Sequence, residues 1–124
     1  MKALYQLAQL PQSGVKARVE GALLRLLFDF SPAESREGED TTGFYDCESV
    51  DVKGNTYGDI VSAIVNDRYS GDDVQAIMAN YAEAVDADSD ITAEKRAEYL
   101  SEYEAYQAWR KHAKEIAHEV VSTL

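Results

Sequence analysis

Apolar residues recur with helical spacing along the last third of the chain. From Thr92 to Leu124 the sequence contains no Gly and no Pro, and its apolar positions follow one another at intervals of three and four. This pattern predicts one amphipathic helix, about 48 Å long at 1.5 Å per residue. Because such a helix exceeds the diameter of a domain of this size, part of its apolar face is expected to serve another chain.

The segment 15–30 fits two periods. Its Leu, Val and Phe residues satisfy helical spacing, and they also alternate with polar residues as in a strand. We favour a strand, because Gly21 interrupts a helix and the acidic stretch SPAESREGEDTTG resembles a long hairpin loop. The next segment, FYDCESVDVKGN, predicts a second strand, in which the broken alternation indicates a bulge or an edge position.

Two short helices are predicted between this strand and the long helix. Thr56 with Asp59, and Ser70 with Asp73, have the spacing of capping boxes before apolar stretches of helical period. Two consecutive short helices predict an αα hairpin. The acidic loop DADSD then leads to Asp90 or Thr92 as the N-cap of the long helix.

These elements predict one α+β domain over residues 1–124. It consists of a small antiparallel sheet or hairpin, a two-helix hairpin and the long C-terminal helix packed across them. The length matches a single compact domain, and a hydrophobic content of 45% is sufficient for a core.

Charge and targeting signals restrict the class of protein. Twelve Lys and Arg against 23 Asp and Glu give a net charge of -11, which disfavours binding to a phosphate backbone. Cys47 is the single cysteine, so an internal disulfide is not possible. The N-terminal sequence lacks the apolar core of a signal peptide, and no stretch has the length of a membrane span. We expect a cytoplasmic protein that binds neither nucleic acid nor membrane.

Two short motifs resemble metal sites but are incomplete. Asp86, Asp88 and Asp90 alternate as at the start of an EF-hand loop, yet Ile91 and Ala97 occupy the positions that require Gly and Glu. Whether this loop binds a cation is left open. The sequence EIAH has the Glu-x-x-His spacing of di-iron bundles, but it occurs once and its Glu115 and His118 fall on the polar side of the helix. The sequence predicts no metal site and no cofactor.

Candidate catalytic side chains are equally isolated. His112 and His118 lie about 120° apart around the helix, so they do not share a ligand, and both are expected among solvated Lys and Glu. Cys47 stands between Asp46 and Glu48, and these carboxylates oppose thiolate formation. No catalytic residue is therefore predicted.

The long helix supplies the candidate interaction surface. Tyr99, Tyr103, Tyr106, Ala113, Ala117, Val120 and Leu124 form a seam at heptad-like spacing, and Arg110 occupies the remaining slot. Trp109 and Ile116 widen the seam on one flank. A buried guanidinium needs a carboxylate or an aromatic face, which the acidic loops of the chain or a second subunit could supply. The alternative is that the whole seam packs on its own domain. We predict a protein partner or a homodimer contacting Tyr99, Tyr103, Tyr106, Trp109, Arg110, Ala113, Ile116 and Val120.

Residues 45–120 resemble a group of known sequences. The stretches YDCESVDVKGNTYGDIVSAIVNDRYSGDDVQAIMANY and EYEAYQAWRKHAKEIAHEV are similar to small uncharacterised proteins encoded in phage and prophage regions of gut Bacteroidales. The first 44 residues lie outside the resemblance. It implies a phage-associated structural or accessory role, in host cytoplasm or virion, and carries no catalytic positions.

The leading hypothesis is therefore a non-enzymatic interaction or assembly component. One alternative is an acidic inhibitor that mimics DNA, which predicts carboxylates spaced like phosphates along one face. The other is a small enzyme of unrecognised type, which predicts a pocket with a perturbed titratable group.

Overall fold

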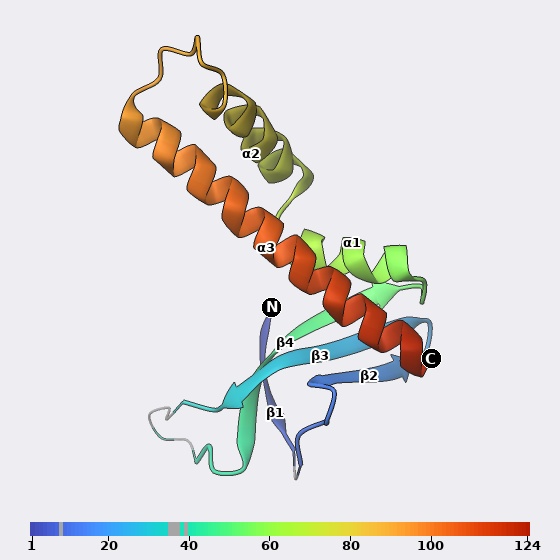
Figure 1. Cartoon of the computed structure of the whole chain (residues 1–124). Helices are drawn as coiled ribbons and strands as arrows, with labels where there is room; N and C mark the ends of the chain where they lie inside the picture. The colour runs from blue at the N-terminus through green and yellow to red at the C-terminus, as the bar shows by residue number, and fades with distance from the viewer. Residues whose placement is uncertain (8, 35–37, 39) are drawn as a thin grey trace.

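The computed structural model describes residues 1–7, 9–34, 38 and 40–124. Its elements are β1 (Lys2–Gln6), β2 (Val15–Glu20), β3 (Leu23–Pro32), β4 (Phe44–Lys53), α1 (Tyr57–Arg68), α2 (Gly71–Ala84) and α3 (Ala93–Thr123). The predicted α+β class, with an antiparallel sheet and a long C-terminal helix, is confirmed. Figure 1 shows a sheet at one end of an elongated molecule and a pair of helices at the other.

The four strands form one antiparallel sheet in the order β1-β4-β3-β2. The strand interpretation of residues 15–30 is confirmed, but the segment forms two strands, because Gly21 takes a left-handed φ of 61° and starts a tight turn. β1 was not predicted. Its pairing with β4 places Lys2 opposite Glu48, a long-range contact that no local sequence pattern predicts.

A bulge lies between β3 and β4, but it is on β3 and not on the segment 44–53 for which it was predicted. Phe28 pairs with Glu48 and Ser31 with Asp46, so β3 carries one residue more than β4 over this interval. Asp29, at the bulge, adopts a positive φ of 56°. β4 itself is an interior strand, so the alternative of an edge position is wrong.

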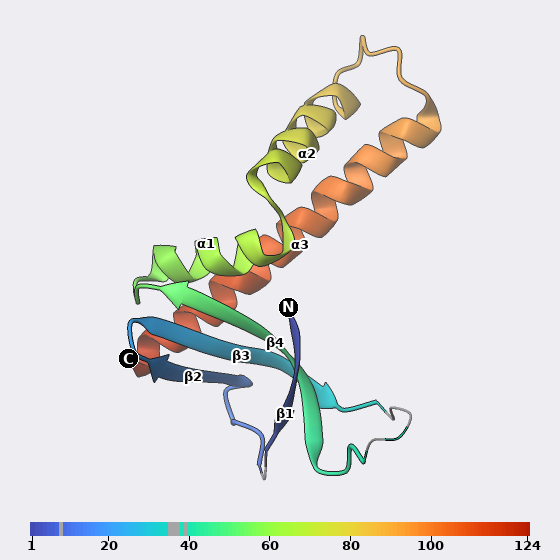
Figure 2. The same cartoon turned by 180° about the vertical axis from the view of Figure 1, so that it is seen from behind.

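One face of the sheet carries the main core. Leu24, Leu26 and Phe28 of β3 alternate inward, and Val50 and Val52 stand beside them on β4. They pack with apolar residues of the helices, among them Ile60, Ile64, Trp109, Ala113, Ile116, Ala117 and Val120. Figure 2 shows α1 and the C-terminal half of α3 over this face.

Local capping fixes where the helices begin. Both capping boxes form as predicted: Thr56 and Ser70 accept from the backbone N–H of Asp59 and Asp73, whose side chains accept in return. Thr92 caps α3 by accepting from the N–H of Lys95 at 3.1 Å. The caps are standard hydrogen-bonding solutions for helix ends and stabilise each helix locally.

The short helices do not pair in the way the sequence suggested. α1 and α2 are consecutive, but each packs against α3, with α1 beside its C-terminal half and α2 beside its N-terminal half. The helical hairpin of this fold is therefore α2 with α3. The extended backbone of Tyr69 turns the chain between α1 and α2, so that the two follow each other along the long helix (Figure 1).

Candidate functional site

α3 presents different buried surfaces along its length. Its C-terminal half buries Trp109, Ala113, Ile116 and Val120 in the core shared with α1 and the sheet. Its N-terminal half meets α2, where Tyr103 stacks on Tyr81 with ring centroids 3.8 Å apart. The two halves of α3 thus contact different elements of the chain.

The predicted interface residues mostly face the chain itself. Tyr106, Trp109, Ala113, Ile116 and Val120 are buried, and Tyr99 and Tyr103 are half-buried. The buried side chains contact the chain's own elements. An interface through this set of residues stays a prediction.

Arg110 does not occupy the seam. It is exposed, whereas Trp109 is 7% exposed and takes the inward position one residue earlier. Successive residues are rotated by about 100° around a helix, so burial of Trp109 turns Arg110 toward solvent. Arg110 therefore needs no buried carboxylate or aromatic partner.

Arg68 makes the contact that had been expected of Arg110. Its guanidinium carbon lies 3.4 Å from the centroid of the Trp109 ring, and one of its nitrogens lies 3.5 Å from Glu48. Glu48 is 8% exposed because it shares the core face of β4 with Val50 and Val52. The Met1 amino group also bonds Glu48, at 3.0 Å. This cluster links the sheet to α1 and α3.

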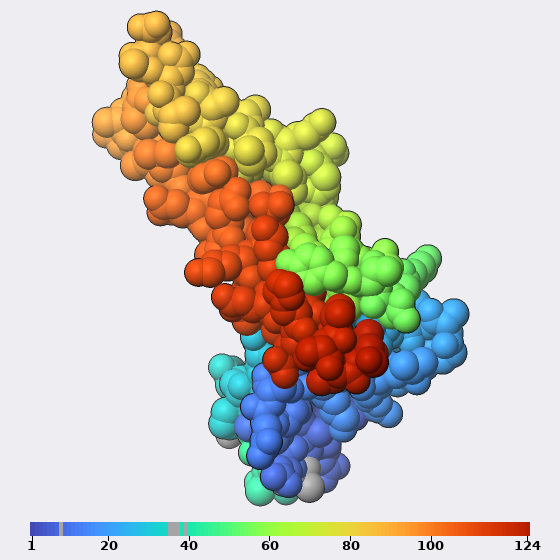
Figure 3. Space-filling view, turned by 45° about the vertical axis from the view of Figure 1, so that its right-hand side comes forward, coloured from blue at the N-terminus to red at the C-terminus, as the bar shows by residue number. Residues whose placement is uncertain are grey.

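Residues 71–105 form a helical arm, which we define as α2, the following loop and the N-terminal half of α3. Figure 3 shows the arm standing away from the half of the molecule that contains the sheet. Besides the Tyr81–Tyr103 stack, Arg96 holds the loop by donating to the carbonyl oxygens of Ala84 and Asp86. The arm is thus an ordered projection with its own internal contacts.

Negative charge is concentrated in the arm. Residues 71–105 contain ten Asp and Glu and two Lys and Arg, a net charge of -8 out of -11 for the chain. Lys95 is engaged by Glu98 at 3.2 Å, and Arg96 by the loop carbonyls. The basic side chains of the arm therefore neutralise little of its acidic surface.

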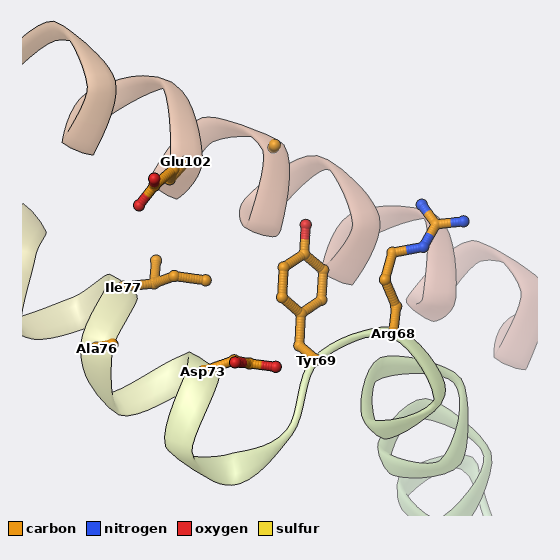
Figure 4. A pocket seen from close by; sticks show the side chains of 7 residues that line it. Arg68, Tyr69, Asp73, Ala76, Ile77 and Glu102 are labelled. Atoms are coloured by element: carbon orange, nitrogen blue, oxygen red, sulfur yellow. The ribbon is translucent and has the colours of Figure 1, made fainter.

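A groove of about 410 Å³ lies at the base of the arm, between α2 and α3. Figure 4 shows the Glu102 side chain reaching from α3 toward α2, and the Tyr69 ring standing between the helices. The lining is apolar around Ile77 and acidic at Asp73 and Glu102; it consists of Arg68, Tyr69, Asp73, Ala76, Ile77, Glu102 and Ala105. Such a groove suits a side chain with an apolar stem and a cationic head.

The Asp86/Asp88/Asp90 loop folds as a turn before α3. Asp86 accepts from the backbone N–H of Asp88 at 2.9 Å, and its carbonyl accepts from Arg96. Among the described residues, no three His, Cys, Asp or Glu side chains are arranged to hold a metal ion. The loop therefore adds negative charge to the arm and forms the turn that connects α2 to α3.

The two histidines occupy different environments. Glu115 and His118 are exposed, as predicted from the helical wheel, and the His118 ring lies 4.6 Å from that of Tyr57. His112 departs from the prediction of a solvated side chain. It is half-buried against Phe28 and Trp109, and its Nε2 lies 2.7 Å from Asp29 at the bulge. The pair joins α3 to the sheet.

Cys47 is fully buried on the sheet face opposite the main core. Burial raises the pKa of its thiol, and the negative charges of Glu48 and Asp46 raise it further. The prediction that these neighbours oppose thiolate formation is confirmed in direction. Leu27 is buried on the same face, where Arg18 donates to the Tyr5 hydroxyl and so links the two edge strands.

Comparison with known proteins gives no relative. No protein-family model matches the chain, and neither a curated protein nor a solved structure is significantly similar to it. The resemblance to phage-encoded proteins therefore stays a prediction. Within the described residues, no helix is both long enough and apolar enough to cross a membrane.

Proposed function

We propose that the chain is a non-enzymatic interaction component that binds a basic surface of a partner protein through its arm. The observation that carries the proposal is the placement of charge: -8 of the net charge of -11 lies on residues 71–105, which project from the sheet. Opposite charge on a partner would steer association and select the partner.

The arm also offers apolar contacts within its acidic surroundings. Met78 and Val85 are 42% and 58% exposed, and Ile77, Ala76 and Ala105 are the apolar residues that line the groove. Interfaces of this kind combine a desolvated centre with a charged rim. We place Glu102 and the Tyr69 ring at the centre of the contact, where a Lys or Arg of the partner would enter the groove.

The groups that could support an enzyme serve other roles. The Cys47 thiol is buried with a raised pKa, and His112 is bound to Asp29 in a contact between α3 and the sheet. These observations support a binding function over catalysis.

A test of the proposal is site-specific photo-cross-linking in the native host. A cross-linking residue replaces Ala105 or Ala76 beside the groove in separate variants, and Ala17 on β2 in a control. We expect the arm positions to capture one basic protein that the control does not capture. Capture only from Ala17, or capture of an acidic protein, would contradict the proposal.

Binding of the purified partner then tests the charges. Glu94→Gln, Glu98→Gln and Glu102→Gln together are expected to weaken binding about tenfold and to reduce its salt dependence. The matched control is Glu115→Gln with Glu119→Gln, on the other end of the same helix, for which affinity is expected to stay unchanged. Equal effects of the two sets would refute a role of the arm.

Charge density keeps DNA mimicry as a second candidate. The arm carries eight net charges, and its axis is at least as long as α2, whose 14 residues span about 21 Å. The spacing is therefore at least about 2.6 Å of axis per charge, against about 1.7 Å for duplex DNA. If mimicry is the function, duplex DNA will displace the chain from its partner. If DNA has no effect, the basic partner is recognised for another purpose.

A further inference from the structure

Among the residues that the structure describes, the outer edge of β2 has no strand beside it. β2 is the last strand of the sheet and pairs there with β3 alone, and its residues Ala17 to Glu20 are all exposed. Val19 lies within this edge and is 75% exposed. An open edge with an exposed apolar residue is a template for pairing with another strand.

The two faces of β2 differ in chemistry. Val19 is paired with Leu24 and therefore points to the helical side of the sheet, where Leu124 is 58% exposed. Val19 and Leu124 both line a notch of about 280 Å³ at this end of the molecule. Lys16, Arg18 and Glu20 alternate with Val19 and point to the opposite face.

These charges distinguish among the symmetric ways in which two β2 strands could pair. In an antiparallel pair centred on Val19, Arg18 of each copy faces Glu20 of the other. A centre on Ala17 would place Lys16 opposite Arg18, and a centre on Arg18 would place two Arg18 side chains together. The Arg18 centre would also pair Lys16 with Glu20 twice, but it sets two like charges on the axis. The Val19 centre combines an apolar contact and two opposite-charge pairs without a like-charge contact.

The overall charge does not oppose association at this end. Residues 1–32 and 107–124 together contain seven Lys and Arg and four Asp and Glu, so the acidic excess lies elsewhere. Figure 1 places the arm at the end of the molecule opposite to β2. Two copies joined at β2 would therefore hold their acidic arms apart.

We propose that two copies of the chain associate edge to edge through β2, about a two-fold axis at Val19. The association extends each four-stranded sheet across the axis and pairs Arg18 with Glu20 twice. It goes beyond the binding role of the arm and does not depend on it. A monomer could still bind a basic partner, so the two proposals fail separately.

Light scattering coupled to size exclusion tests the association. The mass of the full chain is expected to rise from 13.8 kDa toward twice that value as the concentration approaches about 1 mM. Val19→Glu places two carboxylates on the axis and is expected to weaken the dimer at least about tenfold. Val85→Glu on the arm is the matched control, since Val85 is 58% exposed, and it is expected to leave the mass unchanged.

Charge reversal tests the register. Arg18→Glu alone and Glu20→Arg alone each set like charges opposite one another and are expected to return the chain to the monomer. The double variant Arg18→Glu, Glu20→Arg restores both pairs and is expected to restore the dimer, with circular dichroism confirming that each variant is folded. A monomeric wild type at about 1 mM, a folded Val19→Glu variant that dimerises normally, or a folded double variant that stays monomeric would overturn the proposal.

Discussion

Replacing Arg68 with Ala is expected to destabilise the fold, whereas the same change at Arg110 is not. Arg68 stacks on Trp109 at 3.4 Å and lies 3.5 Å from Glu48, while Arg110 is exposed. The two residues are chemically identical and contact or adjoin the same tryptophan. Comparing them isolates the effect of packing from that of charge.

The expected loss of unfolding free energy in Arg68→Ala is the sum of two contacts, one with Trp109 and one with Glu48. A cation–π contact of a partly exposed Arg contributes about 0.5–1 kcal/mol. Loss of its partner leaves Glu48, 8% exposed, with the Met1 amino group, so we add about 1 kcal/mol and not the full cost of an isolated buried charge. Arg68→Ala should therefore lower the free energy of unfolding by about 1.5–2 kcal/mol and Tm by about 6 °C.

Urea unfolding followed by fluorescence provides the measurement, because Trp109 is the single tryptophan and lies within the contact. Arg68→Lys keeps the charge but loses the planar stack, so about half of the loss is expected. Arg110→Ala should change the free energy by less than about 0.5 kcal/mol. If Arg110→Ala costs as much as Arg68→Ala, the assignment of Trp109 and Arg68 to the inward positions is wrong.

Further changes test the caps, the arm and the thiol. Ser70→Ala should cost about 1 kcal/mol in urea unfolding through loss of the α2 cap. The backbone N–H of Ser70, together with its side chain, lowers the pKa of Asp73, so this stabilisation is present above the unfolded pKa and is lost as pH falls through the folded one. The difference in Tm between wild type and Asp73→Ala should therefore shrink below about pH 4. Tyr103→Ala removes the stack on Tyr81 and should speed amide hydrogen exchange in α2 by more than about tenfold while leaving β3 and β4 unchanged; equal acceleration in the sheet would show that the arm is not a separate unit. Cys47 should react with a thiol reagent at least about 100-fold more slowly in the native state than in denaturant, and rapid native labelling would contradict its burial.

Features governed by local interactions could be predicted from the sequence. The caps at Thr56, Ser70 and Thr92 each depend on residues three positions apart, so the motif contains its own structural cause. The turn at Gly21 also left a local sign, whereas the bulge was predicted for β4 and lies on β3. In contrast, β1 depends on a partner strand more than 40 residues away, as in the pairing of Lys2 with Glu48, and its five residues carry no decisive period.

The error at Arg110 has a physical origin. A heptad repeat and an ideal helix drift apart by about 20° per heptad, so a pattern extended along 31 residues does not fix which neighbour faces inward. The size of Trp109 and the apolar residue Ile116 seven positions later were signals for the alternative face. Glu48 offered another signal, because its parity with Val50 and Val52 predicts a buried carboxylate that needs a cationic partner. Arg68, which supplies that partner, belongs to a different element and could not be identified from spacing.

Joining the two proposed surfaces gives a consequence that neither has alone. β2 and the arm lie at opposite ends of the molecule (Figure 1). A dimer formed at β2 would therefore present two acidic arms to the same partner assembly. For a partner that repeats its basic site, the second contact becomes intramolecular, and avidity can exceed the single-arm affinity by about 10²–10⁴ where the spacing fits. Val19→Glu should then weaken binding to the repeated partner without changing binding to one isolated basic site, whereas neutralising Glu94, Glu98 and Glu102 should weaken both. A variant of Val19 that weakens binding to the single site would place β2 inside the partner contact and remove the bivalent arrangement.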